Sequence, residues 1–139
     1  MDTQTKNRQG FSLIELMIVI VISGVLAAIG IAIFNKNIVE AKRTEAVASI
    51  GTIRRQLRLY YAAEGTYPLA PAFTKVVGKP WNDIKPGELT GRYFSDTHYR
   101  YRSYDGIAYR IKCQKAGILD KNIWIDETGN WKFNVLDDD

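Results

Sequence analysis

The fold of this chain is decided by residues 10–34, GFSLIELMIVIVISGVLAAIGIAIF, which carry a single charged side chain, that of Glu15. A transmembrane helix needs ~20 apolar residues to cover a hydrocarbon core of ~30 Å. The segment from Phe11 to Phe34 is therefore long enough to cross a bilayer. A carboxylate costs about 2.5–3.5 kcal/mol at the centre of a membrane helix, so Glu15 is a candidate for a functional role.

A short polar leader with two basic residues, Lys6 and Arg8, precedes this segment. The succession of basic leader, Gly10, aromatic Phe11 and then Glu15 resembles the class III signal of type IV pilins and type II secretion pseudopilins. In that family a prepilin peptidase cuts after the glycine and methylates the new amine. The resemblance implies cleavage between Gly10 and Phe11, N-methylation of Phe11, and an assembly contact between Glu15 and the Phe11 amine of a neighbouring subunit.

Charge pairing gives Glu15 a physical role that does not depend on the family. In a medium of low dielectric constant a paired charge costs far less than a lone one. Within one helix the Phe11 amine and Glu15 lie about 6 Å apart along the axis, so a neighbour displaced along a filament could bring the two groups together. In the alternative, a plain membrane anchor, Glu15 lies at the bilayer edge and reaches the headgroups. A conventional secretory signal fits poorly, because its cleavage site follows the apolar core.

The chain has room for one globular domain besides this segment. It has 139 residues and a formal net charge of +4. About a hundred residues follow the apolar segment, which is enough for one compact core. We expect a cleaved leader at 1–10, a transmembrane or filament-core helix at 11–34, an amphipathic helix at 35–64, and a globular region at 65–139 with a connecting loop and a sheet.

After residue 35 the apolar side chains recur three or four positions apart, which is typical of a helix buried on one side. These residues are Ala46, Ile50, Ile53, Leu57 and Tyr60. Gly65 and Pro68 predict the end of the helix. One helix from Phe11 to Glu64 would be ~80 Å long. A small domain cannot bury that length, so the N-terminal half must meet lipid or other copies of the chain.

Strand patterns dominate the C-terminal third. Residues 99–102 alternate between tyrosine and arginine, and Asp105-Gly106 predicts a hairpin turn into a return strand at 107–113. A second hairpin joins 122–126 to 131–135. Residues 69–94 lack periodicity and are expected to form an irregular loop with a short helix. The predicted fold is α+β and pilin-like: a long N-terminal helix, with a transmembrane half and an amphipathic half, packed on an antiparallel sheet of about four strands.

The expected core joins the helix to this sheet. Ile50, Ile53 and Leu57 would meet four strand residues, which are Ile107, Ile111, Ile123 and Ile125. Cys113 is the only cysteine of the chain, so no intramolecular disulfide can form. We expect Cys113 to face the core on a strand with Ile107, Tyr109 and Ile111.

Basic residues form a candidate ligand surface. They lie on the expected helix and on the expected strands, and they are Arg54, Arg55, Arg58, Arg100, Arg102, Arg110 and Lys112. Tyr99, Tyr101 and Tyr104 interleave with the strand cations, as stacking platforms for DNA would. The alternative is a solvated sheet face with the tyrosines packed on the other side.

Two further constellations have weaker patterns. Calcium could bind at Asp120, Asp126 and Glu127, but their spacing differs from the calcium-loop motif, so no metal is expected. Four aromatic residues could line a conductive filament core, although ordinary packing is commoner; they are Phe11, Phe34, Tyr60 and Tyr61. The single histidine, His98, lacks a nucleophile motif and is expected at the surface where a strand begins. With no phosphate loop or Cys-x-x-Cys, we expect neither an enzyme nor a cofactor.

The sequence therefore predicts a structural subunit of a type IV pilus or pilus-like filament, a homo-oligomeric helical assembly. The subunit would lie in the inner membrane, be processed by a prepilin peptidase, and be assembled by pilus or secretion machinery into a periplasmic or extracellular filament. One alternative is a pseudopilin of a type II secretion system. Another, from a different class, is a monomeric membrane-anchored module that binds DNA or another anionic ligand.

Overall fold

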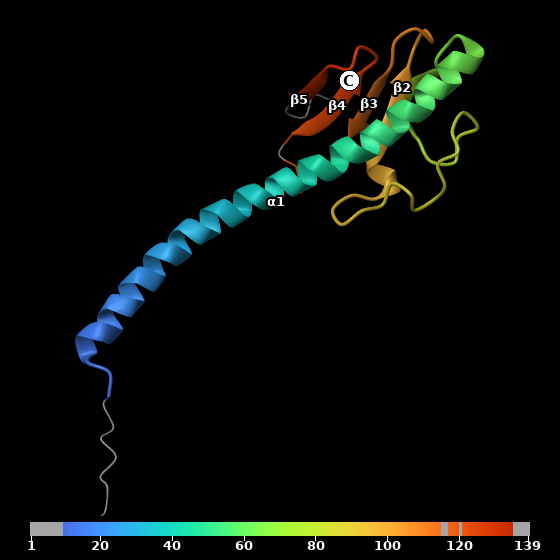
Figure 1. Cartoon of the computed structure of the whole chain (residues 1–139). Coiled ribbons are helices and arrows are strands. Elements are labelled where there is room, and N and C mark those ends of the chain that lie inside the picture. Colours follow the sequence, from blue (N-terminus) through green and yellow to red (C-terminus); the bar gives the residue numbers. More distant parts are fainter. Residues whose placement is uncertain (1–9, 115–116, 120, 135–139) are drawn as a thin grey trace, which may run out of the picture. The chain divides into compact units, whose positions relative to one another are not determined.

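The computed structural model describes residues 10–114, 117–119 and 121–134. An α-helix, α1 (Leu13–Glu64), precedes five strands and a short 3-10 helix (Figure 1). The elements after α1 are β1 (Ala70–Lys75), η1 (Asp96–His98), β2 (Tyr99–Ser103), β3 (Arg110–Cys113), β4 (Asn122–Asp126) and β5 (Trp131–Asn134). By internal contacts the chain divides into two compact units, Met1–Ile38 and Val39–Asp139, which are described separately below.

The second unit contains a five-stranded sheet in the order β1-β2-β3-β4-β5. Each strand pairs antiparallel with the next. Paired residues share a face of the sheet, and the register places Tyr101, Ile111 and Ile125 in one inward-facing row. This arrangement of a long helix and an antiparallel sheet confirms the predicted α+β, pilin-like fold class.

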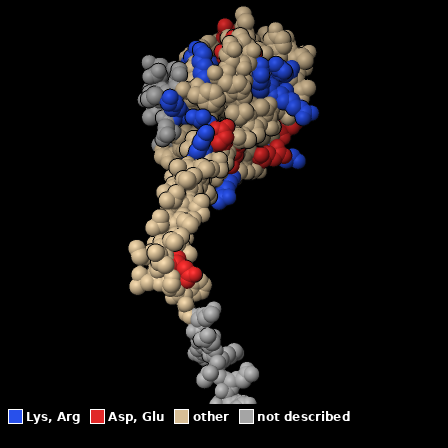
Figure 2. All heavy atoms as spheres, turned by 60° about the vertical axis from the view of Figure 1, so that its left-hand side comes forward, with Lys and Arg blue, Asp and Glu red and all other residues tan. Residues whose placement is uncertain are grey.

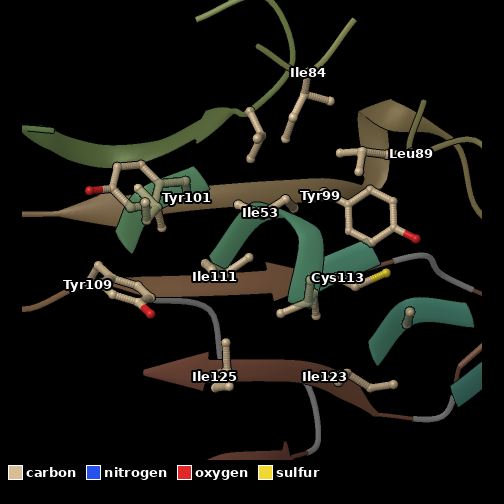
Figure 3. Close-up of a cluster of buried hydrophobic side chains, with 14 of the residues drawn as sticks. Ile53, Ile84, Leu89, Tyr99, Tyr101, Tyr109, Ile111, Cys113, Ile123 and Ile125 are labelled. Atoms are coloured by element: carbon tan, nitrogen blue, oxygen red, sulfur yellow. The ribbon is translucent and has the colours of Figure 1, made fainter. Parts of the chain in front are cut away.

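The core of the second unit lies between α1 and one face of the sheet. The expected helical stripe is buried, because Ala46, Ile50, Ile53 and Leu57 are fully inaccessible to solvent, while Tyr60 is half-buried. In Figure 3 Ile53 of α1 and Ile111 of β3 lie in the same buried cluster, with the rings of Tyr99, Tyr101 and Tyr109 around them. The strand residues of this cluster are Ala70, Tyr99, Tyr101, Ile111, Cys113, Ile123 and Ile125. Burial of Cys113 agrees with the prediction from the sequence.

The end of α1 also agrees with the sequence. Gly65 has a φ of 74° and donates its N–H to the carbonyl of Tyr61 at 2.8 Å. A positive φ is what a helix C-cap requires and what glycine adopts without strain. The helix therefore ends where the sequence predicted, at Glu64.

The prediction of about four strands missed β1, which lies in the segment expected to be an irregular loop. Its alternation is weak because the pairing with β2 shifts register between Ala70 and Thr74. Pro71 also lowers the strand signal, but an edge strand tolerates proline because its outward N–H groups need no partner in the sheet. Pairing with β2, rather than local preference, therefore defines this strand.

The expected core position of Ile107 was wrong, because its side chain is 73% exposed. The return strand was expected from Ile107, but β3 begins at Arg110. The Asp105 carboxylate accepts the N–H groups of Ile107 at 2.9 Å and Ala108 at 3.0 Å. These bonds extend the turn and keep both residues out of the ladder. The second hairpin agrees with the prediction over β4 and residues 131–134, while Val135 lies outside the described residues.

The segment between β1 and β2 is fastened to the helix by a carboxylate. Glu45 of α1 accepts the backbone N–H groups of Arg92, Tyr93 and Phe94 at 2.8–3.2 Å. Gly91 lies so close that a Cβ added there would sit 2.5 Å from the Glu45 carboxyl carbon. Glu45 therefore orders a segment whose sequence shows no secondary-structure period.

Candidate functional site

The N-terminal candidate site lies in the first unit, where α1 begins at Leu13. The Ser12 N–H donates to the Glu15 carboxylate at 2.8 Å, and the Glu15 N–H donates to the Ser12 hydroxyl at 3.3 Å. These reciprocal bonds form a capping box, which satisfies two backbone N–H groups that a helix start leaves without partners. The pattern Ser-x-x-Glu is visible in the sequence, but the functional role expected for Glu15 rested on its charge alone.

The capping box lowers the cost of Glu15 in an apolar segment. Its carboxylate lies in the first turn of α1, where the helix dipole favours a negative charge. A carboxylate has about four sites for accepting hydrogen bonds, so the bond from Ser12 leaves capacity for another donor. Gly10 and Phe11 precede the helix and are exposed, with Phe11 at 85%. The structure thus places the expected cleavage bond in an accessible, non-helical position.

Behind Glu15, α1 presents an apolar surface that the described residues do not cover. Each large apolar side chain from Leu13 to Phe34 is at least 53% exposed. An 18-residue window of α1 reaches a mean hydropathy of 2.9, so by length and composition this helix could cross a membrane. Figure 2 shows this surface as tan, interrupted by an acidic group near the start of the described chain. Such a surface requires lipid or protein around it.

The structure does not bring the predicted basic residues onto one surface. Arg54, Arg55 and Arg58 lie on α1, and Arg54 Nε donates to the Tyr109 hydroxyl at 3.3 Å on the inner side of the sheet. The strand cations belong to the alternate positions, which face away from α1. The two groups therefore do not form one ligand surface, which the sequence offered only as a candidate beside a solvated sheet face.

Two of the predicted stacking tyrosines belong to the core. Tyr99 and Tyr101 are fully buried, and burial raises the pKa of both hydroxyls. The Tyr101 hydroxyl donates to the Pro68 carbonyl at 2.7 Å. Tyr104 remains 64% exposed. The alternative that the sequence analysis left open, cations on one face and tyrosines packed on the other, describes β2 correctly.

Aromatic rings support the cations on the outer side of the sheet. The Phe73 ring lies 4.5 Å from the Arg102 guanidinium and 4.1 Å from Lys112 Nζ. The Trp124 ring lies 4.9 Å from the guanidinium of Arg110 and 4.8 Å from Nζ of Lys132. Contacts at these distances are attractive cation–π interactions. Phe73, Trp124 and Lys132 were not among the predicted site residues, although the alternation of residues along β4 and β5 indicates that the last two share one face.

The remaining predicted sites gain no support as ligand sites. Asp120 lies outside the described residues, and no group of three or more potential metal ligands occurs among the residues that are described. Asp126 accepts the N–H groups of Thr128 and Asn130 at 3.1 Å and so shapes the turn between β4 and β5. Glu127 accepts the Tyr109 N–H at 3.4 Å.

His98 and the aromatic set also differ from a ligand site. His98 was expected at the surface, but it is half-buried in η1, where its Nδ1 accepts the Ser95 N–H at 2.9 Å. Phe11 and Phe34 are exposed in the first unit. In the second unit Tyr61 packs against Tyr67, with ring centroids 4.6 Å apart. These contacts explain the packing of His98 and Tyr61 without a ligand.

Comparison with known proteins bears on the N-terminal segment. Residues 5–31 match the family described as the prokaryotic N-terminal methylation motif. The chain is 38% identical over 61 residues to fimbrial protein EcpC of Eikenella corrodens, an alignment that covers 44% of this chain and 40% of that protein. It is 36% identical over 82 residues to the type II secretion system core protein G of Dickeya chrysanthemi, with coverage of 58% and 54%. The chain thus aligns with about half the length of these curated relatives.

Proposed function

We propose that this chain, a subunit of the type IV pilin and type II secretion pseudopilin family by its methylation motif and its relatives, builds a type IV pilus or pilus-like filament. Members of that family are structural subunits rather than enzymes. The observation that supports this most strongly is the methylation motif at the head of an apolar half-helix. Its side chains have no cover among the described residues, and packing against the same segment of other subunits would provide that cover.

Maturation would create the assembly end of the subunit. A prepilin peptidase would cut between Gly10 and Phe11 and methylate the Phe11 amine. The exposed, non-helical position of both residues is suited to a peptidase. The product would carry a cationic amine just before the first turn of α1.

That amine would need a counter-charge once it leaves water. Glu15 of a neighbouring subunit would supply it, because a desolvated pair costs far less than two separate charges. The Ser12 bond would orient the Glu15 carboxylate without using all of its acceptor capacity. Before assembly the subunit would reside in the inner membrane with its second unit outside the bilayer. It would then be incorporated into a periplasmic or extracellular filament.

A pseudopilin of a type II secretion system is the second candidate. The alignment with the secretion relative is the longer of the two, with 82 residues against 61, and both alignments extend beyond the apolar segment. Deleting the chain separates the two candidates. Loss of surface filaments on electron micrographs supports the pilus, whereas intact filaments with loss of type II secretion support the pseudopilin.

Three variants test the role of Glu15 in assembly, each expressed as the sole copy of the chain. Glu15→Gln keeps a side chain that can complete the capping box but removes the charge. Ser12→Ala removes one half of the box, at a cost of about 1 kcal/mol, and keeps the charge. Glu15→Ala removes the charge and also the acceptor for the Ser12 N–H. We expect normal membrane levels in all three, with filament yield lost in both Glu15 variants and largely kept in Ser12→Ala.

The measurement is the amount of sheared filament, normalised to membrane-inserted, cleaved subunit on immunoblots. Normal yield in Glu15→Gln, together with loss in Ser12→Ala, would mean that helix capping matters and charge pairing does not. Normal yield in all three would leave Glu15 without a role in assembly and would favour the plain membrane anchor.

A further inference from the structure

The side of α1 that faces away from the sheet carries a shallow hollow in the second unit. Its volume is about 350 Å³. The residues that line it are Gly51, Arg54, Arg55, Arg58 and Leu59. All of them are exposed except Arg54, which is half-buried, whereas Ile53 and Leu57 of the same helical turns are fully buried against the sheet. The hollow, which we call the arginine groove, therefore lies on the side of the helix that its own unit does not cover.

The arginine groove gathers positive charge that the described chain does not neutralise. Residues 46–63 of α1 include three arginines and no carboxylate. Arg54 donates to the Tyr109 hydroxyl at 3.3 Å, but no carboxylate of the described residues lies within ion-pair distance of Arg55 or Arg58. Like charges three or four positions apart repel each other on a helix. An anionic group from outside the described chain would relieve this repulsion.

Gly51 and Leu59 also point to a partner at the arginine groove. Glycine destabilises the interior of a helix relative to alanine. Nothing lies within 4 Å of the position that a Cβ would occupy at Gly51, so packing within the described chain does not require glycine there. Leu59, a large apolar residue, is exposed at the other end of the groove. A partner that approaches α1 closely at Gly51 and covers Leu59 would account for both residues.

The sequence contains an anionic segment that complements the arginine groove. Residues 135–139 read Val-Leu-Asp-Asp-Asp; they follow β5 and lie outside the described residues. No other part of the sequence has three adjacent carboxylates. The segment places two apolar residues beside three anions, and the groove places Leu59 beside Arg55 and Arg58. The two surfaces thus match in apolar character and are opposite in charge.

The spacing along the chain favours the segment of a neighbouring copy over that of the same copy. Phe133 of β5 lies against α1 at Arg43, with the guanidinium 5.7 Å from the ring. Arg55 and Arg58 come twelve and fifteen positions after Arg43, which corresponds to about 18 Å and 22 Å along the helix. Asp137 follows Phe133 by only four residues, and a chain advances at most about 3.5 Å per residue. An internal contact would therefore require the segment to be almost fully extended along α1.

We propose that residues 135–139 of one copy of this chain bind the arginine groove of a neighbouring copy. The aspartates accept charge-assisted hydrogen bonds from Arg55 and Arg58, and the apolar pair covers Leu59. Each copy has one groove and one segment, so the contact is heterologous and can repeat from copy to copy. The inference rests on the proposed assembly of the chain into a filament, and it assigns one contact between the subunits.

Cysteine cross-linking between copies of the full chain tests this contact. Cells express Leu59→Cys and Leu136→Cys as two separate copies, and an oxidant then forms disulfides. Mass spectrometry of tryptic peptides detects the disulfide between positions 59 and 136. Because neither copy carries both new cysteines, this disulfide can form only between copies. Cys113 is buried, and samples that pair each variant with the unaltered chain show its background. The matched control pairs Leu59→Cys with Asp83→Cys, at an exposed position elsewhere, and should give little product.

Charge reversal tests the electrostatic part of the contact. Arg55→Glu/Arg58→Glu in the copy that carries the groove cysteine should lower the yield of the disulfide about fivefold or more, which is the effect of losing an exposed ion pair. Asp137→Arg/Asp138→Arg in the other copy should lower it as well. The combination of both reversals should restore the yield, because the charges are again opposite.

Two further variants separate the contact from folding and from overall charge. Gly51→Leu fills the groove where no described atom is close, so it should raise the melting temperature of the subunit and lower the yield of the disulfide. Lys85→Glu/Lys121→Glu reverses two exposed charges elsewhere and should leave the yield unchanged.

A charge-dependent disulfide between positions 59 and 136, in sheared filaments or in the membrane fraction, supports the contact. Its absence from both fractions, equal yield in the Asp83→Cys control, or no recovery when both sets of charges are reversed would overturn it. Filaments of the unaltered chain are counted separately. Filaments without the disulfide reject the contact and leave the filament proposal standing, whereas the disulfide without filaments supports the contact and rejects the filament proposal.

Discussion

The two halves of α1 differ in whether their large apolar side chains are buried within the chain. In the second half Ile53 and Leu57 are fully buried against the sheet of their own unit. In the first half Leu26 and Ile29 are 65% and 55% exposed. Both halves contain leucine and isoleucine, and both belong to one continuous helix. The difference is that one half finds its apolar partner within the chain, whereas the other requires it from outside.

Charge placement shows the same division. The first half has its acidic residue at the very start of the helix, where Ser12 and the helix dipole accommodate it. The second half uses a carboxylate differently, because Glu45 holds three backbone N–H groups of the segment before β2. The carboxylate of Glu15 thus remains able to bind a group of another subunit, whereas the carboxylate of Glu45 binds backbone groups of its own chain.

The largest effect on stability should come from truncating the buried stripe. Leu57→Ala removes a fully buried side chain and should cost about 2–5 kcal/mol of unfolding free energy. Leu59→Ala, two positions away and 58% exposed, should cost no more than about 0.5 kcal/mol. Thermal unfolding of the full chain in detergent, followed by near-ultraviolet circular dichroism, compares the two. Equal melting temperatures of the two variants would show that Leu57 does not pack in the core of the second unit.

Leu26→Ala extends this comparison to the first half of the helix. Leu26 is 65% exposed, so the substitution should leave the melting of the second unit unchanged. Its effect should instead appear in filament yield, where subunits would pack on this surface. A marked drop in the melting temperature would contradict the division of α1 into two halves.

A smaller loss is expected at Glu45. Glu45→Ala leaves three backbone N–H groups without their acceptor and should cost about 2–3 kcal/mol. Gly91→Ala should act on the same contact, because its Cβ would collide with the carboxylate. Glu40→Ala is the control, since Glu40 forms only a long, exposed ion pair with Arg43 at 3.9 Å, and such pairs contribute under about 1 kcal/mol. Equal effects of the Glu40 and Glu45 variants in the same melting assay would contradict the anchoring role.

The smallest expected effect is the loss of stability at low pH that depends on Asp126. Partial burial tends to raise the pKa of Asp126, but hydrogen bonds from Thr128, Asn130 and Gly129 outweigh it and hold the pKa below the ordinary value of 3.8. A carboxyl group with a lowered pKa in the folded state stabilises the fold above its unfolded pKa. That contribution should disappear as the pH falls through the folded pKa.

The expected loss is below about 1 kcal/mol, because water screens a group near the surface. Urea titrations between pH 7 and pH 2.5 should show a steeper decline for the unaltered chain than for Asp126→Asn. Asp83→Asn, at an exposed position, should decline like the unaltered chain. Identical pH profiles for all three proteins would mean that Asp126 does not contribute to the pH dependence of stability.

Local patterns were readable from the sequence because their cause is local. The stripe that contains Ile53 follows helical spacing, and the cap at Gly65 needs only a residue that tolerates positive φ. Strand β4 was predicted with its observed bounds because its residues alternate between two environments. The same local logic could have identified the capping box of Ser12 and Glu15, whose Ser-x-x-Glu pattern is explicit.

Features that depend on distant partners were missed. Strand β1 exists through its pairing with β2, and its register shift hides the alternation. Nothing in the sequence around Glu45 indicates that its carboxylate accepts hydrogen bonds from the backbone of Arg92 to Phe94, nearly fifty positions along the chain. Ile107 was assigned to the core because its apolar character outweighed the turn-forming carboxylate of Asp105.

We propose above that the first half of α1 is a processed assembly segment rather than a plain anchor. The most direct measurement is the intact mass of the chain recovered in filaments sheared from cells that contain prepilin peptidase. We expect a chain that begins at Phe11 and carries one added methyl group. A chain that still begins at Met1 and stays in the membrane fraction, in cells whose peptidase processes another substrate, would contradict it.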